Sequence, residues 1–286
     1  MAKGNDGHLL QHAVEAELAF TLFDRGGGKG LYLVLTHGMR PFEPFEEPRG
    51  GPHKLLDDML ALCLSSDTIA ENAPHILSSY RSMRTSDQRY PNSAEIIASV
   101  TNRNLLNGIV TEKEGYCREL EARWKGRSLR VSQANWRNHV ASDFACPNGL
   151  KTPWLISLDP YHFKTKRRPE SCSDGCLYAE DLADLHKLLR GYLSVYPDGA
   201  ISVFSYSMSP SVQRSFELSI LRDLVSDLHC LHRLKVSTSA GCVHRTLSKH
   251  VGYAVSPSYD LLRTVQYACA EVGLKSELRS CRRVIE

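Results

Sequence analysis

Residues 31–36 read Leu-Tyr-Leu-Val-Leu-Thr, a continuous apolar run that lies between a glycine-rich segment at 26–30 and a proline-rich segment at 41–52. A short run without polar alternation is typical of a strand that is covered on both faces, as in the middle of a parallel sheet. The flanking glycines and prolines interrupt regular structure on either side. We therefore expect 31–36 to be a central strand of the fold.

Short apolar runs alternate with longer amphipathic stretches along the rest of the chain. The spacing predicts further strands at 105–110, 129–132, 154–158, 200–206, 234–239 and 251–256, and helices at 8–23, 114–124, 180–195, 211–229 and 259–272. Residues 53–102 are mainly helical in pattern and form an insertion. This alternation predicts a single α/β domain over 1–286, with a Rossmann-like, seven-stranded, mostly parallel, doubly wound sheet.

Composition excludes several other classes of protein. No run approaches 18 apolar residues, so we expect no membrane span, and the polar N-terminus lacks the apolar stretch of a secretory signal, which favours a cytoplasmic protein. The nine cysteines are scattered and odd in number, unlike a disulfide scaffold. The net charge of +3 does not by itself require a nucleic-acid partner. Cys172 and Cys176 would need about two more ligands to hold zinc, so we expect an exposed loop and no metal there.

The loop after the strand at 154–158 carries the most specific local pattern. Here Asp159, Pro160 and Tyr161 follow a buried strand, and ligands of doubly wound sheets bind beyond the carboxyl ends of the strands. The exocyclic amine of adenine is a weak nucleophile, because its lone pair is delocalised into the ring. A carboxylate and a carbonyl that accept its hydrogens would sharpen that lone pair, and an aromatic ring would hold the base by stacking. The alternative is that Asp-Pro simply begins a turn.

Three other loops at the same edge of the sheet are weaker candidates. Gly38, after the first strand, would let a cofactor approach the backbone closely. Glu112 could bind the two hydroxyls of a ribose, and Asn135 could reach an adenine, although an exposed acid and a helix cap are the ordinary interpretations. After Asp159 come four cations, which would suit phosphate contacts or a merely solvated loop: Lys164, Lys166, Arg167 and Arg168.

In this order, these features resemble the large-subunit ribosomal RNA adenine methyltransferases of the J type, over about residues 4–257. The family's opening Gly-Asn and Leu-Lys-His are similar to Gly4-Asn5 and Leu10-Gln11-His12, and its Asp-Thr-His to Leu35-Thr36-His37. The family's Tyr-Pro-Gly-Ser is similar to Tyr90-Pro91-Asn92-Ser93, and its Thr-Glu to Thr111-Glu112. Its Lys-Ala-Asp is similar to Gln133-Ala134-Asn135, and its Asp-Pro-Pro-Tyr to Asp159-Pro160-Tyr161.

The resemblance implies an S-adenosylmethionine-dependent methyltransferase fold and transfer of a methyl group to the exocyclic amine of adenine in nucleic acid, with RNA favoured over DNA. It implies catalytic roles for Asp159, Pro160 and Tyr161, with His162 or Phe163 as substitutes for the stacking ring. The residues implied to line the S-adenosylmethionine site are Asn5, His12, Thr36, His37, Gly38, Glu112 and Asn135.

The chain departs from the family where Leu35 and Asn135 replace acids and where one proline is missing before Tyr161. Because a shift of about 1 Å can cost roughly 100-fold in rate, these changes leave a second reading open. In that reading the fold persists as a catalytically lapsed module that binds nucleic acid or a protein partner. The three-Cys-motif partners, which have methyltransferase architecture, are another family that the chain is similar to.

Overall fold

The computed structural model describes most of the chain, with gaps. The described residues are 6–38, 41–44, 75, 89–112, 114–133, 135–144, 152–160, 162–170, 176–193, 198–206, 210–224, 228–236, 250–271 and 274–280. Gly4, Asn5, Ala134, Tyr161 and Cys172, all named above, lie outside them, as does most of the expected helical insertion at 53–102.

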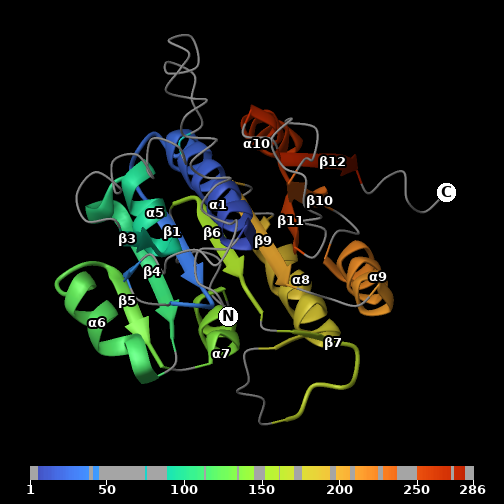
Figure 1. Cartoon of the computed structure of the whole chain (residues 1–286), viewed down its shortest axis with the longest axis horizontal. Helices are drawn as coiled ribbons and strands as arrows, with labels where there is room; N and C mark the ends of the chain where they lie inside the picture. The colour runs from blue at the N-terminus through green and yellow to red at the C-terminus, as the bar shows by residue number, and fades with distance from the viewer. Residues whose placement is uncertain are drawn as a thin grey trace.

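A single eight-stranded sheet forms the centre of the molecule (Figure 1), in the order β12-β10-β11-β9-β6-β1-β4-β5. The five strands from β9 to β5 are parallel, while β11 is antiparallel to its neighbours β9 and β10, and β12 is antiparallel to β10. The strands are β1 (Leu31–Leu35), β4 (Leu106–Thr111), β5 (Leu129–Ser132), β6 (Trp154–Leu158), β9 (Gly199–Tyr206), β10 (His229–Val236), β11 (His250–Ser256) and β12 (Leu274–Ser280).

The strand order reverses beside β1. The chain runs from β1 outward to β4 and β5 on one side, and then returns to place β6 and β9 on the other side. Leu33 accordingly pairs with Gly108 of β4 and with Leu155 of β6. This is the doubly wound, Rossmann-like arrangement, and its switch point lies between β1 and β6. The expected α/β class is confirmed, whereas the expected seven strands are corrected to eight by β12.

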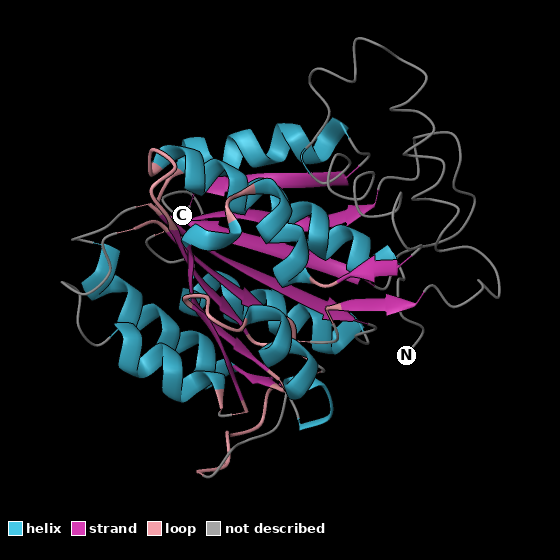
Figure 2. Cartoon of the chain, turned by 90° about the vertical axis from the view of Figure 1, so that its left-hand side faces the viewer, coloured by secondary structure: helices cyan, strands magenta, loops and turns pink. Residues whose placement is uncertain are grey.

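Helices cover both faces of the sheet, as Figure 2 shows. On one face α1 (Asp6–Arg25), α5 (Ser93–Val100), α6 (Glu114–Trp124) and α10 (Tyr259–Glu271) contribute to one buried apolar cluster. On the other, α7 (Trp136–Phe144), α8 (Ala179–Leu193) and α9 (Pro210–Ser219) contribute to a second cluster. Two small sheets, β2 (Phe42–Pro44) with β3 (Arg89–Pro91) and β7 (Phe163–Lys164) with β8 (Leu177–Tyr178), lie in the loops.

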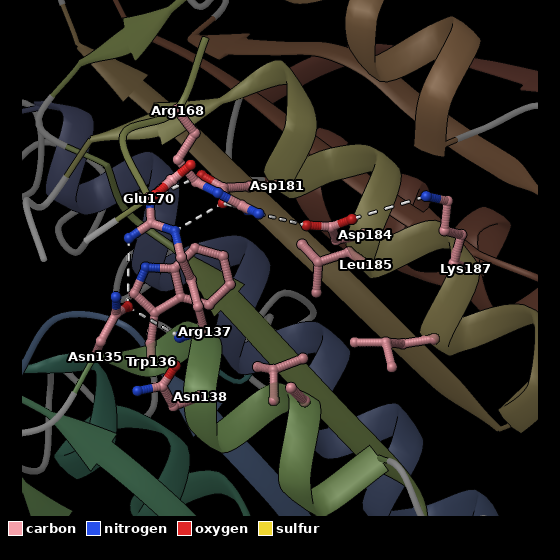
Figure 3. Close-up of a pocket in the computed structure, with 13 residues that line it drawn as sticks. Asn135, Trp136, Arg137, Asn138, Arg168, Glu170, Asp181, Asp184, Leu185 and Lys187 are labelled. Carbon is pink, nitrogen blue, oxygen red and sulfur yellow. Dashed lines mark hydrogen bonds and ion pairs between the residues drawn. The ribbon is translucent and has the colours of Figure 1, made fainter. Parts of the chain in front are cut away.

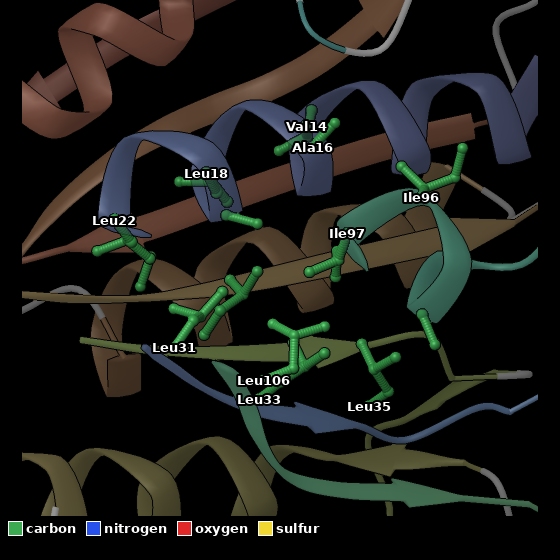
Figure 4. Close-up of a cluster of buried hydrophobic side chains, with 14 of the residues drawn as sticks. Val14, Ala16, Leu18, Leu22, Leu31, Leu33, Leu35, Ile96, Ile97 and Leu106 are labelled. Carbon is green, nitrogen blue, oxygen red and sulfur yellow. The ribbon is translucent and has the colours of Figure 1, made fainter. Parts of the chain in front are cut away.

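The central strand β1 explains why residues 31–36 are apolar without alternation. Leu31, Leu33 and Leu35 belong to the cluster under α1 (Figure 4), whereas Tyr32 and Val34 point to the opposite cluster. All five are buried. Burying one leucine side chain contributes about 2 kcal/mol, so the strand is anchored from both layers.

Gly108 allows β4 to lie directly against β1. Its φ is +118°, and a Cβ there would meet the Leu33 carbonyl oxygen at 2.0 Å. Only glycine adopts this conformation without strain, and no side chain fits the space. The β1–β4 pair, which carries two of the candidate loops, therefore depends on this residue.

The structure corrects two predicted boundaries in the last third of the chain. The helix predicted over 211–229 ends earlier: α9 passes into a π-helical segment, η3 (Ile220–Leu224), and β10 already begins at His229. The strand predicted at 234–239 overlaps the end of β10 at residues 234–236, and residues 237–239 lie outside the described residues. Helix α7, in which Trp136 and Val140 face the core one turn apart, was not predicted.

Candidate functional site

The loops that leave β1, β4 and β6 meet at the carboxyl edge of the sheet, beside the switch point. The Asp159 backbone N–H donates to Thr36 Oγ1 at 3.1 Å. The Gly38 N–H donates to Glu112 Oε2 at 2.9 Å. Hydrogen bonds therefore link residues that lie 74 and 123 positions apart in the chain. The structure brings together Thr36, His37, Gly38, Glu112 and Asp159, five of the residues named in the sequence analysis.

Gly38 is packed so closely that no side chain fits. A Cβ there would lie 2.7 Å from Glu112 Cβ and 2.6 Å from Leu120 Cδ1. Its carbonyl oxygen accepts a hydrogen bond from Asn92 Nδ2 at 2.8 Å, and Asn92 also caps α5 by accepting from the Glu95 N–H. The loop after β1 is thus fastened to the N-terminus of α5 and to the end of β4.

His37 lies at the centre of a partly buried polar group. Its Nε2 is 3.2 Å from Ser93 Oγ, 2.5 Å from Gln11 Nε2 and 3.9 Å from Asp159 Oδ2. The side chains of His37 and Asp159 are only 13% and 11% exposed. Because the pair is nearly dry, the protonation state of the imidazole affects the carboxylate directly.

Helix α1 contributes Gln11 to this polar group, the neighbour in sequence of the predicted residue His12. His12 is buried on α1, and its neighbour Gln11, at the position where the resembling family has lysine, contacts His37. Ser93 and Asn92 were also not among the predicted site residues. The signal for them was the Tyr-Pro-Asn-Ser run at 90–93.

An unexpected acid lies beneath this polar group. Glu15 of α1 is fully buried, and its Oε1 accepts hydrogen bonds from Gln11 Nε2 at 3.1 Å and from Ser157 Oγ. Burial raises the pKa of Glu15 to about 7, against the lowering effect of its hydrogen bonds to Ser157, Ser93 and Gln11. Sequence reasoning missed it, because Glu15 lies on a helix whose pattern looked simply amphipathic.

Asn135 follows β5 and borders a neighbouring pocket of about 420 Å³ between α7 and α8 (Figure 3). Its Oδ1 accepts from the Arg137 N–H at 3.1 Å, and Arg137 in turn makes a two-fold ion pair with the buried carboxylate of Asp181. Asp181 also binds Arg168. The pocket lining carries equal numbers of basic and acidic side chains. The basic ones are Arg137, Arg168 and Lys187, and the acidic ones are Glu170, Asp181 and Asp184.

The four predicted phosphate-binding cations differ in their surroundings. Lys166 and Arg167 are exposed. Lys164 lies over the Tyr178 ring, 5.5 Å from its centroid, and Arg168 is bound by Asp181 and Asp184. The outward-facing charge of this loop therefore comes mainly from Lys166 and Arg167.

The residues that follow Asp159 differ in how far they are buried. Pro160 is buried, and His162 is exposed. Phe163 packs in the core with its ring centroid 4.8 Å from that of Phe216. Cys176 is buried rather than exposed, and its carbonyl accepts from Arg137 Nη2.

Among the described residues, no cluster of three or more metal-ligating side chains occurs, and none of their helices is long and apolar enough to cross a membrane.

Comparison with known proteins extends the description of the fold. No family model matches the chain, and no curated protein matches it in sequence. The crystal structure of a protein of Legionella pneumophila strain Philadelphia 1, of the family model DUF519, superposes with a TM-score of 0.60 at 13% identity, over 97% of this chain and 98% of that chain. A DUF574 family protein from Streptomyces avermitilis gives a TM-score of 0.39 at 10% identity, over 87% and 83%. The first similarity shows that the two chains share a fold along their whole lengths.

Proposed function

We propose that this protein is an S-adenosylmethionine-dependent methyltransferase that acts on the exocyclic amine of adenine in nucleic acid, with RNA preferred to DNA. One observation carries the proposal: Thr36, Gly38, Glu112 and Asp159, from three loops, are joined by hydrogen bonds at the switch point of a doubly wound sheet. Ligands of such sheets bind at this place.

The groups around Gly38 suit an adenosyl ligand. Gly38 lies directly against Glu112, and its backbone N–H donates a hydrogen bond to the Glu112 carboxylate. A carboxylate at the end of the second parallel strand is the group that binds ribose hydroxyls in related sheets. S-adenosylmethionine would supply the methyl group, and Thr36, His37, Gly38 and Glu112 would hold it, with Asn5, His12 and Asn135 as further predicted contacts.

Asp159 is the residue that we expect to act on the substrate. Its backbone is fixed by Thr36, so the carboxylate and the Pro160 carbonyl would accept the two hydrogens of the target amine without reorganisation. The amine nitrogen would attack the methyl carbon directly, the carbon–sulfur bond would break, and one amine proton would pass to an acceptor such as Asp159. Tyr161 would stack on the base.

The experiment is transfer of labelled methyl groups to total RNA and total DNA. We expect label in RNA, and a loss of at least about 100-fold in Asp159→Asn, because the amide cannot accept a proton. Glu121→Gln, which changes an exposed acid on α6, is the control and should transfer normally. Transfer that persists in Asp159→Asn would reject the assignment of Asp159.

A lapsed, binding-only module is the second candidate. The observation that favours it is that Asn135, which replaces an acid of the resembling family, is engaged with Arg137. This candidate predicts salt-dependent binding of nucleic acid or of a protein partner, with no methyl transfer under any condition.

A further inference from the structure

The pocket between α7 and α8 lies beside the loop that follows the candidate catalytic residue (Figure 3). It has a volume of about 420 Å³, and the chain that leaves β6 at Asp159 reaches its lining at Arg168. Both helices contribute to its apolar wall: Val140 and Ala141 of α7, and Leu185 and Leu188 of α8. A ligand in this pocket would therefore lie between two helices and against that loop.

Asp181 fixes the walls of the pocket relative to one another. Its buried carboxylate on α8 accepts from Arg137 Nε at 2.7 Å and Nη2 at 2.8 Å, from Arg168 Nη1, and from the Tyr178 N–H at 2.9 Å. A carboxylate offers about four lone pairs, so these bonds occupy it. Asp181 thus holds α7, α8 and the loop at Arg168 together, and its role is structural.

Arg168 and Asp184 are held side by side and can form further hydrogen bonds. Arg168 Nη2 donates to Asp184 Oδ2 at 2.8 Å, and its Nη1 donates to Asp181. These bonds use one hydrogen of each terminal nitrogen of the guanidinium. Asp184 Oδ1 lies 4.0 Å from Lys187 Nζ, and the Asp184 side chain is 47% exposed, so its carboxylate can accept more hydrogens. The pair therefore presents donors and acceptors from fixed positions.

The charge of the lining favours a neutral ligand. The three basic and three acidic side chains of the pocket cancel, so an anion such as phosphate gains little from the pocket as a whole. The apolar wall favours a ring with apolar faces, and Arg168 with Asp184 favours a polar edge that both accepts and donates. A nucleobase has both properties, since each base has a π-face and a hydrogen-bonding edge.

Among the four bases, guanine matches the order of these groups. Its N1–H and N2–H are adjacent donors, which a carboxylate accepts with its two oxygens, and its O6 lies beside them as an acceptor for a guanidinium. Adenine and cytosine each offer a carboxylate one amine, and uracil offers a single N–H between two acceptors. Guanine is thus the base that binds the carboxylate through two hydrogen bonds while its O6 faces the neighbouring cation.

We propose that the pocket between α7 and α8 binds a guanine base, with Asp184 accepting from N1–H and N2–H and Arg168 donating to O6. In single-stranded nucleic acid this is a base near the target adenine, because the loop from Asp159 to Arg168 joins the two places. The exposed Lys166 and Arg167 of that loop then contact phosphates. The position near a methylated adenine rests on the proposed function, whereas guanine binding does not.

The test is calorimetry of the full-length protein with guanosine and inosine 5′-monophosphates, in the absence of a methyl donor. Inosine lacks only the N2 amine, so both ligands share O6, the sugar and the phosphate. We expect the guanosine nucleotide to bind at least about tenfold more tightly, because inosine leaves one oxygen of Asp184 without its hydrogen bond. Adenosine 5′-monophosphate should bind no better than the inosine nucleotide.

Asp184→Asn tests the carboxylate through its effect on that ratio. An amide has one acceptor oxygen and turns an N–H toward the second guanine donor, so the preference for guanosine should fall to about threefold or less. A loss of stability alone would weaken the binding of both nucleotides and leave their ratio unchanged. Asp260→Asn changes an exposed acid on α10, at the opposite face of the sheet, and is the control that should keep the ratio.

Ala141→Phe is a second variant, which decides the question if Asp184→Asn does not fold. Ala141 lines the pocket from an exposed position of α7, so a phenyl ring there occupies the pocket without entering the core. We expect this variant to bind the guanosine nucleotide at least about tenfold more weakly.

Three results would overturn the proposal: equal binding of the guanosine and inosine nucleotides, a ratio that Asp184→Asn leaves unchanged, or no binding of either nucleotide at millimolar concentration. Methyl transfer is measured separately, to RNA with and without inosine in place of every guanosine. If the wild type methylates both RNAs equally, the placement near the target adenine is wrong and the proposed function stands. If it methylates neither while the nucleotide ratios hold, the proposed function is wrong and the guanine pocket stands.

Discussion

At the scale of single residues, Gly38 is a position of the candidate site where an added side chain would collide with its neighbours. Its Cβ would meet Leu120 and Glu112, both inside normal contact distance. We predict that Gly38→Ala displaces the Glu112 carboxylate, destabilises the fold by about 1–3 kcal/mol through overpacking, and weakens S-adenosylmethionine binding at least about tenfold. Urea unfolding and calorimetry measure the two effects.

Gly115→Ala is the matched control for this change. A Cβ at Gly115, on the exposed face of α6, would meet nothing within 4 Å. Since alanine favours a helix over glycine by about 1 kcal/mol, the control should be neutral or slightly stabilising. If Gly38→Ala behaves like Gly115→Ala, the close packing around Glu112 has no functional meaning.

Glu15 makes a second prediction at this scale, about stability and pH. Its pKa in the folded protein is about 7, above the ordinary 4.5. The folded state therefore binds more protons than the unfolded chain between these values, so the Glu15 contribution to stability is complete below pH 4.5 and is lost as pH rises through 7. The size is about 3 kcal/mol.

Glu15→Gln removes this dependence. We predict that the variant gains stability relative to the wild type between pH 5 and pH 8, with the difference in unfolding free energy growing over that window. Urea denaturation at both pH values measures it. A constant difference between the two proteins would show that Glu15 does not titrate in this range.

At the scale of elements, a buried acid fastens α5 to its neighbours. Glu95 is 2% exposed and is held by Arg103 of η1 (Arg103–Leu105) and by Arg123 of α6. Removing the acid leaves two guanidinium groups without their partner, so the variant should be clearly destabilised. Because both groups can still reach solvent, we predict that Glu95→Ala costs about 3 kcal/mol, the low end for a broken buried ion pair. Arg103→Ala should cost less, because Arg123 remains.

A double-mutant cycle with Glu95→Ala and Arg103→Ala separates the pair from its surroundings. We expect a coupling of at least about 0.5 kcal/mol. Strict additivity would mean that the pair adds nothing to the position of α5, and hence of Asn92 and Ser93.

The basic loop after β6 makes another prediction at this scale. Lys166 and Arg167 are exposed, whereas Arg168 is bound to acids of α8. If the first two contact phosphates, Lys166→Ala with Arg167→Ala should reduce the salt slope of single-stranded RNA binding by about 1.4, at about 0.7 per contact. Lys29→Ala with Lys125→Ala, two exposed cations at the amino ends of the strands, should leave it unchanged.

Strands whose apolar sequence reflects burial between helices were predictable from the sequence. Strands that form because a distant strand pairs with them were not. The strands β1, β6 and β9 are apolar because helices cover both faces, so the sequence identifies them. Strand β12 reads Leu-Lys-Ser-Glu-Leu-Arg-Ser, since an edge strand carries charges that oppose further pairing. Its pairing with β10 is a long-range property that local pattern does not express.

The same distinction holds for the candidate site. Asp159, Glu112 and Gly38 were predictable, because they follow strands whose ends must meet at one edge of the sheet. Gln11 and Glu15 were not predictable, because their role depends on which side of α1 faces the carboxyl end of β6. Helical periodicity alone does not distinguish a buried polar position from an exposed one.

At the scale of the whole molecule, the account depends on an adenosyl group binding where β1 and β4 end. A hydrogen bond between Asp159 and Thr36 crosses the switch point, and one between Gly38 and Glu112 joins the ends of β1 and β4. The fold is shared over its whole length with another protein at 13% identity. Such a similarity identifies the architecture, so the function has to be established at the site itself.

Calorimetry with S-adenosylmethionine and its demethylated product tests this claim most directly. We predict binding of both by the wild type, with affinity reduced at least about tenfold in Glu112→Gln and unchanged in Glu121→Gln, the exposed acid on α6. No binding heat from either ligand at millimolar concentration, or equal binding by all three proteins, would contradict the account.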